Sequence, residues 1–288
     1  MAELGVSDDL SVTPAAAKAR APWDDTRCAF ARNPAALFGF YVTAVLVVLA
    51  LFGPGFAEAR WIANAETRNF LAQMAGGLRM TLALAFLAAL VAFVFGAIWG
   101  ALAGGLGGAI AGILMWIVDA LAVLPLPLFV IAGVALLTPP DPTARLELLA
   151  GAIGASAWLG VARAVYARII ALRRAVFVDA ARAAGASPAQ IFFRHVALNL
   201  LGALAAPASL IFPTAVTVES TLSFLGFGPQ VASVSLGALI AHGAAHMDAD
   251  PWRLAAPCLL LAALLAALQL MGDGLRSAIA EIAPERAP

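Results

Sequence analysis

Charged residues are scarce in this chain, and their scarcity excludes most soluble folds. Asp, Glu, Lys and Arg make up 12% of the 288 residues, whereas 63% are hydrophobic. Soluble domains usually carry about 25% charged and about 45–50% apolar residues. The 17 basic and 17 acidic residues cancel, so no net field attracts nucleic acid. The mean hydropathy of +0.95 also argues against disorder, which needs low hydrophobicity and high net charge. These proportions predict a polytopic membrane protein.

Lysine and cysteine are also nearly absent. Lys18 is the single lysine, whereas a phosphate-binding loop of the GxxxxGK[ST] type needs a lysine on the nucleotide phosphates. The chain therefore does not hydrolyse ATP by that route, and it has no HExxH, GxSxG or CxxC pattern. Cys28 and Cys258 are too few for a disulfide framework. We expect a chain that is not an enzyme and has no catalytic, cofactor-binding or metal site of its own.

Six apolar segments approach the length of about 20 residues that a helix needs to cross a bilayer. They are residues 35–52, 80–103, 109–137, 146–162, 196–218 and 254–272. Residues 1–33 form a polar cytoplasmic tail, and we expect 35–288 to be one all-α transmembrane domain. Twelve of the 17 basic residues lie before the first segment, between the fourth and fifth, or after the sixth, which places both termini in the cytoplasm. Residues 220–247 carry no charge and predict an outer-face loop or a partly re-entrant segment.

The clearest motif lies in the cytoplasmic loop at about residues 163–199. Small and apolar positions recur there at helical spacing: Val176, Phe177, Ala180, Ala181 and Ala184. Gly185 fits the left-handed position that ends a helix. Ser187, Pro188 and Gln190 then predict a capping box with proline in the first turn of a second helix, whose apolar stripe begins at Ile191. The pattern predicts two helices joined by a sharp turn that docks onto a partner. An amphipathic loop lying on the bilayer surface is the alternative.

Asp179-Ala180-Ala181, followed by Gly185, resembles the EAA loop of the permeases of binding-protein-dependent ABC importers. Three further stretches resemble the dipeptide/oligopeptide-type permeases, and in particular their C-type subunit: residues 115–119, 219–228 and 272–276. The resemblance implies the type I ABC importer fold, with six transmembrane helices and a cytoplasmic coupling-helix loop. Asp179 stands where the family usually has Glu, which keeps the charge and shortens the side chain.

By this resemblance, the loop fits a cleft on one or two cytoplasmic ATPase subunits, and ATP and Mg²⁺ belong to those partner chains. The chain would pair with a homologous permease in the bacterial inner membrane and receive peptides from an extracytoplasmic substrate-binding protein. The expected ATPase-coupling residues are Phe177, Asp179, Ala180, Ala181, Arg182, Gly185, Ser187, Pro188 and Ile191. Nickel or another small solute is the alternative cargo, and an ion-coupled secondary transporter is the alternative function.

Polar residues within the apolar segments are candidates for the translocation pathway or its gate, because charge at membrane depth is costly. Asp119 interrupts the third segment. It has three possible roles: lining the pathway, pairing with the partner subunit, or bonding to backbone that Pro125 and Pro127 leave free. Glu219 and Ser223 lie where the fifth segment ends. They are candidates for an outer gate or a receptor contact, with simple interfacial placement as the alternative.

Two further groups of polar residues lie towards the C-terminus. His242 and His246 are four residues apart, a spacing that suits a divalent metal on one helical face, although solvated loop side chains explain them as well. Asp273 and Arg276 predict a local ion pair at the inner end of the last segment. Neither group is assigned a metal or a cofactor.

Overall fold

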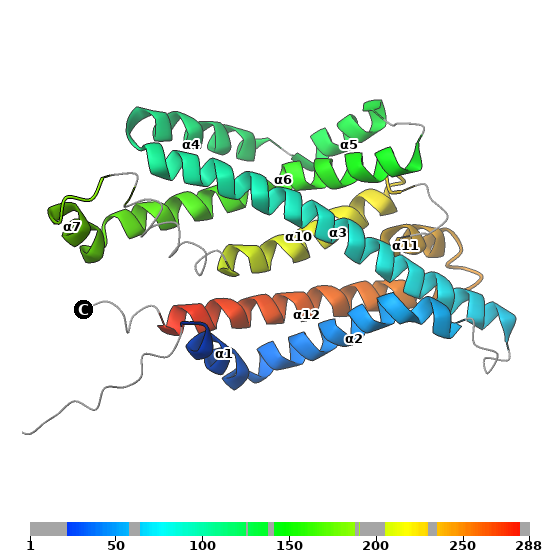
Figure 1. Ribbon diagram of the computed structural model, residues 1–288. Coiled ribbons are helices and arrows are strands. Elements are labelled where there is room, and N and C mark those ends of the chain that lie inside the picture. Colours follow the sequence, from blue (N-terminus) through cyan, green and yellow to red (C-terminus); the bar gives the residue numbers. More distant parts are fainter. Residues whose placement is uncertain are drawn as a thin grey trace, which may run out of the picture.

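The computed structural model describes residues 22–57, 64–124, 126–137, 141–187, 190, 205–229 and 235–282. Within these residues every regular element is a helix (Figure 1), as the sequence predicts. In chain order the helices are α1 (Pro22–Arg32), α2 (Pro34–Ala57), α3 (Ala65–Leu106), α4 (Gly108–Val123), α5 (Leu126–Leu137), α6 (Pro142–Arg173), α7 (Val176–Ala183), α10 (Ala205–Phe224), α11 (Leu236–Ala245) and α12 (Trp252–Ile282).

Local capping decides where several of these helices begin. Four of them start after a side chain that accepts a hydrogen bond from a first-turn N–H: Asn33 before α2, Asn64 before α3, Asp141 before α6 and Ser235 before α11. Such caps satisfy donors that have no partner within the helix. Proline follows Asn33 and Asp141 directly, at a position where its missing N–H costs nothing.

Four described helices are long and apolar enough to cross a membrane: Pro34–Gly53, Ala65–Leu106, Ala144–Arg173 and Trp252–Ile279. They correspond to the first, second, fourth and sixth predicted segments. The third segment is two shorter helices instead, α4 and α5, because the residue before a proline is forced out of the helical region. Leu124, which precedes Pro125, is extended, with φ −72° and ψ 140°. The start of the fifth segment, up to residue 204, lies outside the described residues.

The stretch at residues 220–247 also differs from its prediction. Its first residues continue α10 to Phe224, so Glu219 and Ser223 lie inside that helix rather than after it. Leu236–Ala245 then forms the separate helix α11, which the sequence analysis treated as a loop or a partly re-entrant segment. α11 packs against α12, α10 and α3. The uncharged residues Leu236–Ala245 therefore fold as a helix, one side of which is buried against these neighbours.

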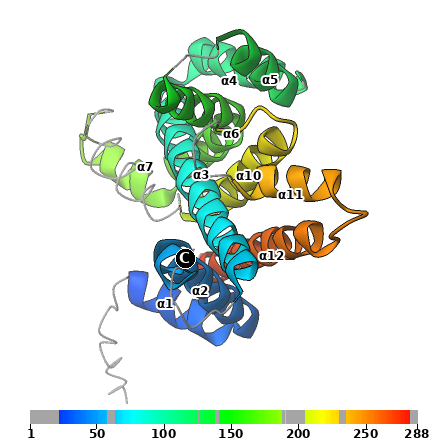
Figure 2. The same ribbon diagram turned by 90° about the vertical axis from the view of Figure 1, so that its right-hand side faces the viewer.

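α3 is the central helix of the bundle. Figure 2 shows it between a group containing α4, α5 and α6 and a group containing α1, α2 and α12, with α10 and α11 to one side. Its most extensive contact is with α6. Figure 1 shows α7 and α11 at opposite ends of the bundle, with α7 near the end of α6 and α11 near the start of α12.

Glycines allow α3 and α6 to approach closely. Gly96, Gly100 and Gly104 recur every fourth residue on the buried face of α3. A β-carbon added at Gly96 would lie 2.6 Å from the carbonyl oxygen of Trp158, and one at Gly104 would lie 2.7 Å from Ile169 Cγ2. Small residues at this spacing let helix backbones pack directly in a membrane. This close packing of α3 against α6, the glycine seam, fixes the position of the end of α6, after which α7 begins.

Candidate functional site

α7 is held against the end of α6 by a short hydrogen-bonded bend. The N–H of Arg174 donates to Ala171 O at 3.2 Å, and that of Ala175 donates to Leu172 O at 3.1 Å. The bend turns the chain so that Val178 is fully buried, in the cluster that also contains Val165 and Ile169 of α6. One side of α7 is therefore anchored in the membrane domain.

The other side of α7 is exposed and carries small residues. Asp179, Ala180 and Ala183 are exposed on neighbouring positions of the helix, and Ala184 follows them. Ala181 is half-buried and packs against the cluster that contains Val178. Phe177 and Arg182 lie in α7, where the structure describes their backbone alone. An exposed face of alanines lets another chain approach the backbone of α7 closely.

A left-handed glycine ends α7, as the sequence predicts. Gly185 has φ +85°. The N–H of Ala184 donates to Ala180 O at 3.0 Å, and that of Ala186 donates to Ala181 O at 3.1 Å. This second bond is the one that defines a Schellman motif, and it satisfies a carbonyl of the last helical turn.

The predicted capping box follows directly after this turn. The N–H of Gln190 donates to Ser187 Oγ at 3.2 Å, and the N–H of Ser187 donates to Gln190 Oε1 at 3.0 Å. The reciprocal pair is the capping-box geometry. Pro188 and Ile191, which we predicted in the coupling surface, lie outside the described residues, as do the residues beyond Gln190 for which the sequence predicts the second helix.

Arg173, the last residue of α6, bonds to the end of α3, a contact that was not predicted from the sequence. Its Nη1 donates to Gly104 O at 2.7 Å and to Gly105 O at 3.2 Å. These carbonyls belong to the last turn of α3, where a positive charge also complements the helix dipole. The ends of α3 and α6 are thereby joined one turn before α7 begins. The glycine spacing on α3 was visible in the sequence, but nothing local marked Arg173 as its partner.

Glu219 lies near the C-terminal end of α10, where it is buried among hydroxyl groups. Ser223 Oγ donates to Glu219 Oε1 at 2.7 Å, and Ser220 Oγ donates to Oε2 at 3.3 Å. The hydroxyls of Thr81 and Ser235 are also within hydrogen-bonding reach of this carboxyl. All five residues are buried. A buried carboxyl group needs such donors, because burial without them is costly.

The same cluster joins three helices. Thr81 Oγ1, on α3, accepts a hydrogen bond of 3.1 Å from the N–H of Leu236 at the start of α11. Ser235 caps α11 by accepting from the N–H of Ala238. Glu219, on α10, thus faces hydroxyls that themselves hold the start of α11. Glu219 and Ser223, the two residues predicted to form an outer gate or a receptor contact, are therefore hydrogen-bonded to each other and buried.

Asp119 has a partner in its own chain. Arg163 Nη2 lies 2.7 Å from Asp119 Oδ1, and Arg163 Nε donates to the same oxygen at 2.9 Å. Arg163 was predicted to lie in the cytoplasmic loop, but α6 continues as a helix to Arg173. The ion pair therefore connects α4 to α6. An ion pair within the chain was not among the three roles predicted for Asp119.

The polar pairs near the C-terminus are local. Arg276 Nη1 lies 3.6 Å from Asp273 Oδ1, which confirms the predicted ion pair. The rings of His242 and His246 stack with centroids 4.5 Å apart, and His246 Nδ1 lies 2.9 Å from His242 O. Among the described residues, no three His, Cys, Asp or Glu side chains converge as a metal site.

Comparison with known proteins assigns the chain to a family. Residues 96–281 match the family described as the binding-protein-dependent transport system inner membrane component. The chain belongs to this family. It is therefore a multi-pass membrane protein, in keeping with its four long apolar helices. Residues 21–70 match a second family, the N-terminal TM domain of oligopeptide transport permease C.

Named relatives span nearly the whole chain. It is 33% identical to the oligopeptide transport system permease protein OppC of Haemophilus influenzae, over 90% of this chain and 88% of that one. The OppC of Escherichia coli strain K12 is 34% identical over 90% and 91% of the two chains. The OppC of Mycobacterium tuberculosis strain H37Rv is 35% identical over 75% and 73%.

A solved structure has the same fold. Its title is inward facing conformations of the MetNI methionine ABC transporter, and it aligns with a TM-score of 0.55 at 20% identity, covering 70% of this chain and 94% of that one. At this identity the likeness shows the fold alone, which is that of a chain of this ABC transporter.

Proposed function

We propose that this chain is a permease subunit of an ABC importer for peptides. With a homologous permease it forms the translocation pathway, and a binding protein delivers the substrate. The observation that carries the proposal is the match to oligopeptide permeases over 90% of the chain. Those relatives favour peptides over nickel or another small solute as the cargo. Membership of a binding-protein-dependent family likewise favours an importer over an ion-coupled secondary transporter.

The proposed topology has six transmembrane helices and both termini in the cytoplasm. α2, α3, α6 and α12 supply four of the crossings. α4 with α5 supplies a fifth crossing, and α10 belongs to the sixth. Under this arrangement the ends of α3 and α6 lie on the cytoplasmic side, where α7 protrudes, and α11 lies on the outer side. The excess of arginine around α7 supports the same orientation.

α7 and the turn that follows it are the proposed contact with the ATPase subunits. A chain with a single lysine and no phosphate-binding loop must receive energy from another protein. α7 is suited to transmit it, because Val178 is buried in the membrane domain and the alanine face is exposed. The Schellman motif and the capping box make the turn rigid. Arg173 would pass a displacement of α7 to the end of α3.

The candidates for the pathway take positioning roles in this proposal. Glu219, to which Ser223 is bonded, faces the hydroxyls that hold the start of α11, so we expect both residues to act on a gate at the outer end through the position of α11. Asp119 and Arg163 fix α4 on α6 closer to the cytoplasmic end. Both groups are therefore expected to affect opening and closing of the pathway more than recognition of the substrate.

Reconstitution tests the proposal. The chain is co-expressed with its partner permease and ATPase subunits, purified, and placed in liposomes with the binding protein outside. We expect uptake of radiolabelled trialanine that requires ATP inside the vesicles and the binding protein outside, and no uptake of ⁶³Ni²⁺ in the same vesicles. Peptide uptake by this chain alone, driven by an ion gradient, would overturn the proposal. So would purification of the chain without any ATPase or second permease.

A further inference from the structure

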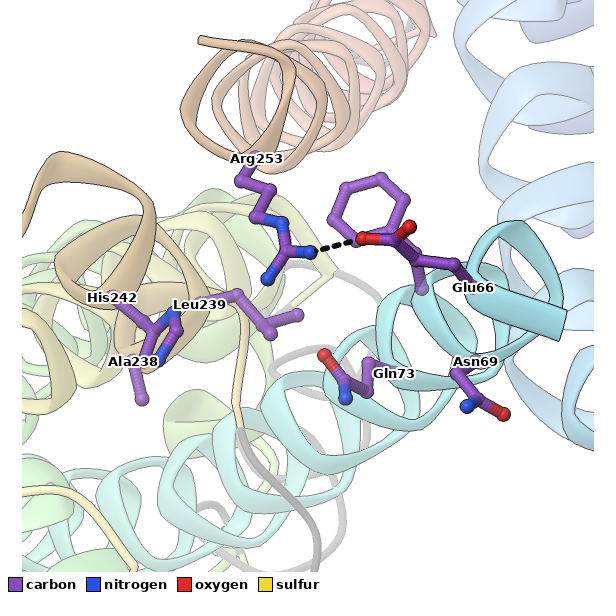
Figure 3. Close-up of a pocket in the computed structure, with 8 residues that line it drawn as sticks. Glu66, Asn69, Gln73, Ala238, Leu239, His242 and Arg253 are labelled. Carbon is purple, nitrogen blue, oxygen red and sulfur yellow. Dashed lines mark hydrogen bonds and ion pairs between the residues drawn. The ribbon is translucent and has the colours of Figure 1, made fainter. Parts of the chain in front are cut away.

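A cavity of about 450 Å³ opens between the starts of α3 and α12 and one side of α11. Figure 3 shows side chains from all three helices around it: Glu66 and Gln73 from α3, Leu239 and His242 from α11, and Arg253 from α12. It lies at the end of the bundle opposite α7, which is the outer face in the topology proposed above. Its size is typical of sites for small ligands.

The cavity is lined by an ion pair that is exposed to solvent. Arg253 Nη2 lies 2.6 Å from Glu66 Oε1, and Arg253 Nε lies 2.9 Å from Asp250 Oδ2. The Glu66 side chain is 73% exposed and that of Arg253 is 40% exposed. Exposed ion pairs contribute little to stability, so a ligand that brings its own ammonium and carboxylate groups can exchange with this pair at small cost.

Two amides line the same cavity. Asn69 and Gln73 lie four residues apart on α3, so they occupy one face of the helix, next to Glu66. Both are exposed, and neither amide makes a hydrogen bond within the described part of the chain. Each offers two N–H donors and a carbonyl acceptor, which is the complement of a peptide bond. Phe70 and Leu239 supply an apolar wall beside them.

We propose that this cavity binds a short peptide by its backbone and termini as the peptide enters the importer. The peptide's ammonium group binds Glu66, its carboxylate binds Arg253, and the amides of Asn69 and Gln73 bond to its peptide groups. Recognition of backbone groups tolerates varied side chains. The inference rests on the proposed function, because it names a site for the cargo of that importer. A phosphoethanolamine headgroup carries an ammonium and an anionic group as well, so the test must separate peptide from lipid.

Equilibrium binding to the whole importer, without the binding protein, tests the site. The complex is placed in phosphatidylcholine nanodiscs and titrated with radiolabelled trialanine. We expect saturable binding that Glu66→Gln and Gln73→Leu each weaken at least tenfold. N-acetyl-trialanine, which lacks the ammonium group, should compete at least tenfold more weakly than trialanine. Thr67→Ala and Asp248→Asn are matched controls at the same end of the bundle, outside the cavity lining, and should bind like the wild type.

Any of these results would overturn the inference: no saturable binding to the wild type, unchanged binding by both cavity variants, or equal competition by N-acetyl-trialanine. Loss of trialanine binding when phosphatidylethanolamine replaces phosphatidylcholine would assign the cavity to lipid and also overturn it. ATPase rate and elution volume of each variant complex show that it is assembled. Peptide uptake by the wild type without an effect of the cavity variants would refute the site and leave the proposed function intact. Absence of wild-type uptake would refute the proposed function by itself.

Discussion

Replacing Gly185 by valine tests whether the turn after α7 is what an ATPase partner requires. Gly185 has φ +85°, and a β-carbon at this position would meet no atom within 4 Å. The substitution therefore acts through the backbone and not through a clash. A left-handed conformation costs a residue other than glycine about 1–2 kcal/mol, which lowers the equilibrium constant for forming the native turn about 5–30-fold. The apparent Kd for the ATPase subunits should rise by up to the same factor.

Two further variants separate this effect from general destabilisation. Gly226 follows α10 at the opposite end of the bundle and has φ +86°, again with no atom within 4 Å of an added β-carbon. Gly226→Val therefore imposes the same backbone strain far from α7. Gly185→Asn restores a residue that tolerates the left-handed region. We expect weakened ATPase binding in Gly185→Val, and near wild-type ATPase binding in both of the others.

The assay is a titration of the purified permease pair in nanodiscs with the ATPase subunits, followed by ATP hydrolysis stimulated by the binding protein with peptide. Loss of stimulated hydrolysis in Gly185→Val should accompany the weaker ATPase binding, while membrane insertion stays normal. If Gly185→Val binds the ATPase subunits as tightly as the wild type, the turn is not the contact we propose. If Gly226→Val is equally impaired, backbone strain anywhere in the chain explains the loss, and the reasoning also fails.

Three further substitutions test individual contacts. Gly100→Leu should destabilise the permease by about 1–3 kcal/mol or more, because an added β-carbon would lie 2.8 Å from Val165 Cβ; the thermal midpoint of the purified permease measures it. Glu219→Leu should lower that midpoint as well, since each buried hydroxyl left without its acceptor costs about 1–3 kcal/mol. Arg173→Ala should speed hydrogen exchange at the end of α3, where the lost contact is worth about 0.3–2 kcal/mol.

Each of these has a matched control. Gly112→Leu, on the exposed side of α4 where an added β-carbon meets nothing, should leave the midpoint unchanged. Glu219→Gln keeps an acceptor for the hydroxyls and should fall between wild type and Glu219→Leu. Arg173→Lys keeps the charge and should protect the end of α3 in part. A midpoint that is equal in Gly100→Leu and Gly112→Leu would show that the seam is looser than described. An unchanged exchange rate in Arg173→Ala would show that α3 ends without its help.

The membrane class and the turn after α7 were predictable from the sequence because both depend on composition or on neighbouring residues. Gly185, Ser187 and Gln190 lie within six positions, and their bonds join atoms of the same short segment. The spans of α2, α3, α6 and α12 follow from the length and hydropathy of continuous segments. The break between α4 and α5 was also encoded locally, in the prolines after Leu124, although the sequence analysis treated that stretch as one segment.

Tertiary structure alone decided which distant groups meet. Arg173 bonds to Gly104 across 69 positions, and Thr81 accepts from Leu236 across 155. Glu66 and Arg253 meet across 187 positions to line one cavity. No periodicity relates residues so far apart, because their contact depends on how complete helices pack. The sequence by itself determined that this is a helical membrane protein in which a glycine turn and a capping box follow α7. Helix packing determined what that turn is anchored to, where Glu219 is buried, and that the end of the bundle opposite α7 has a polar cavity.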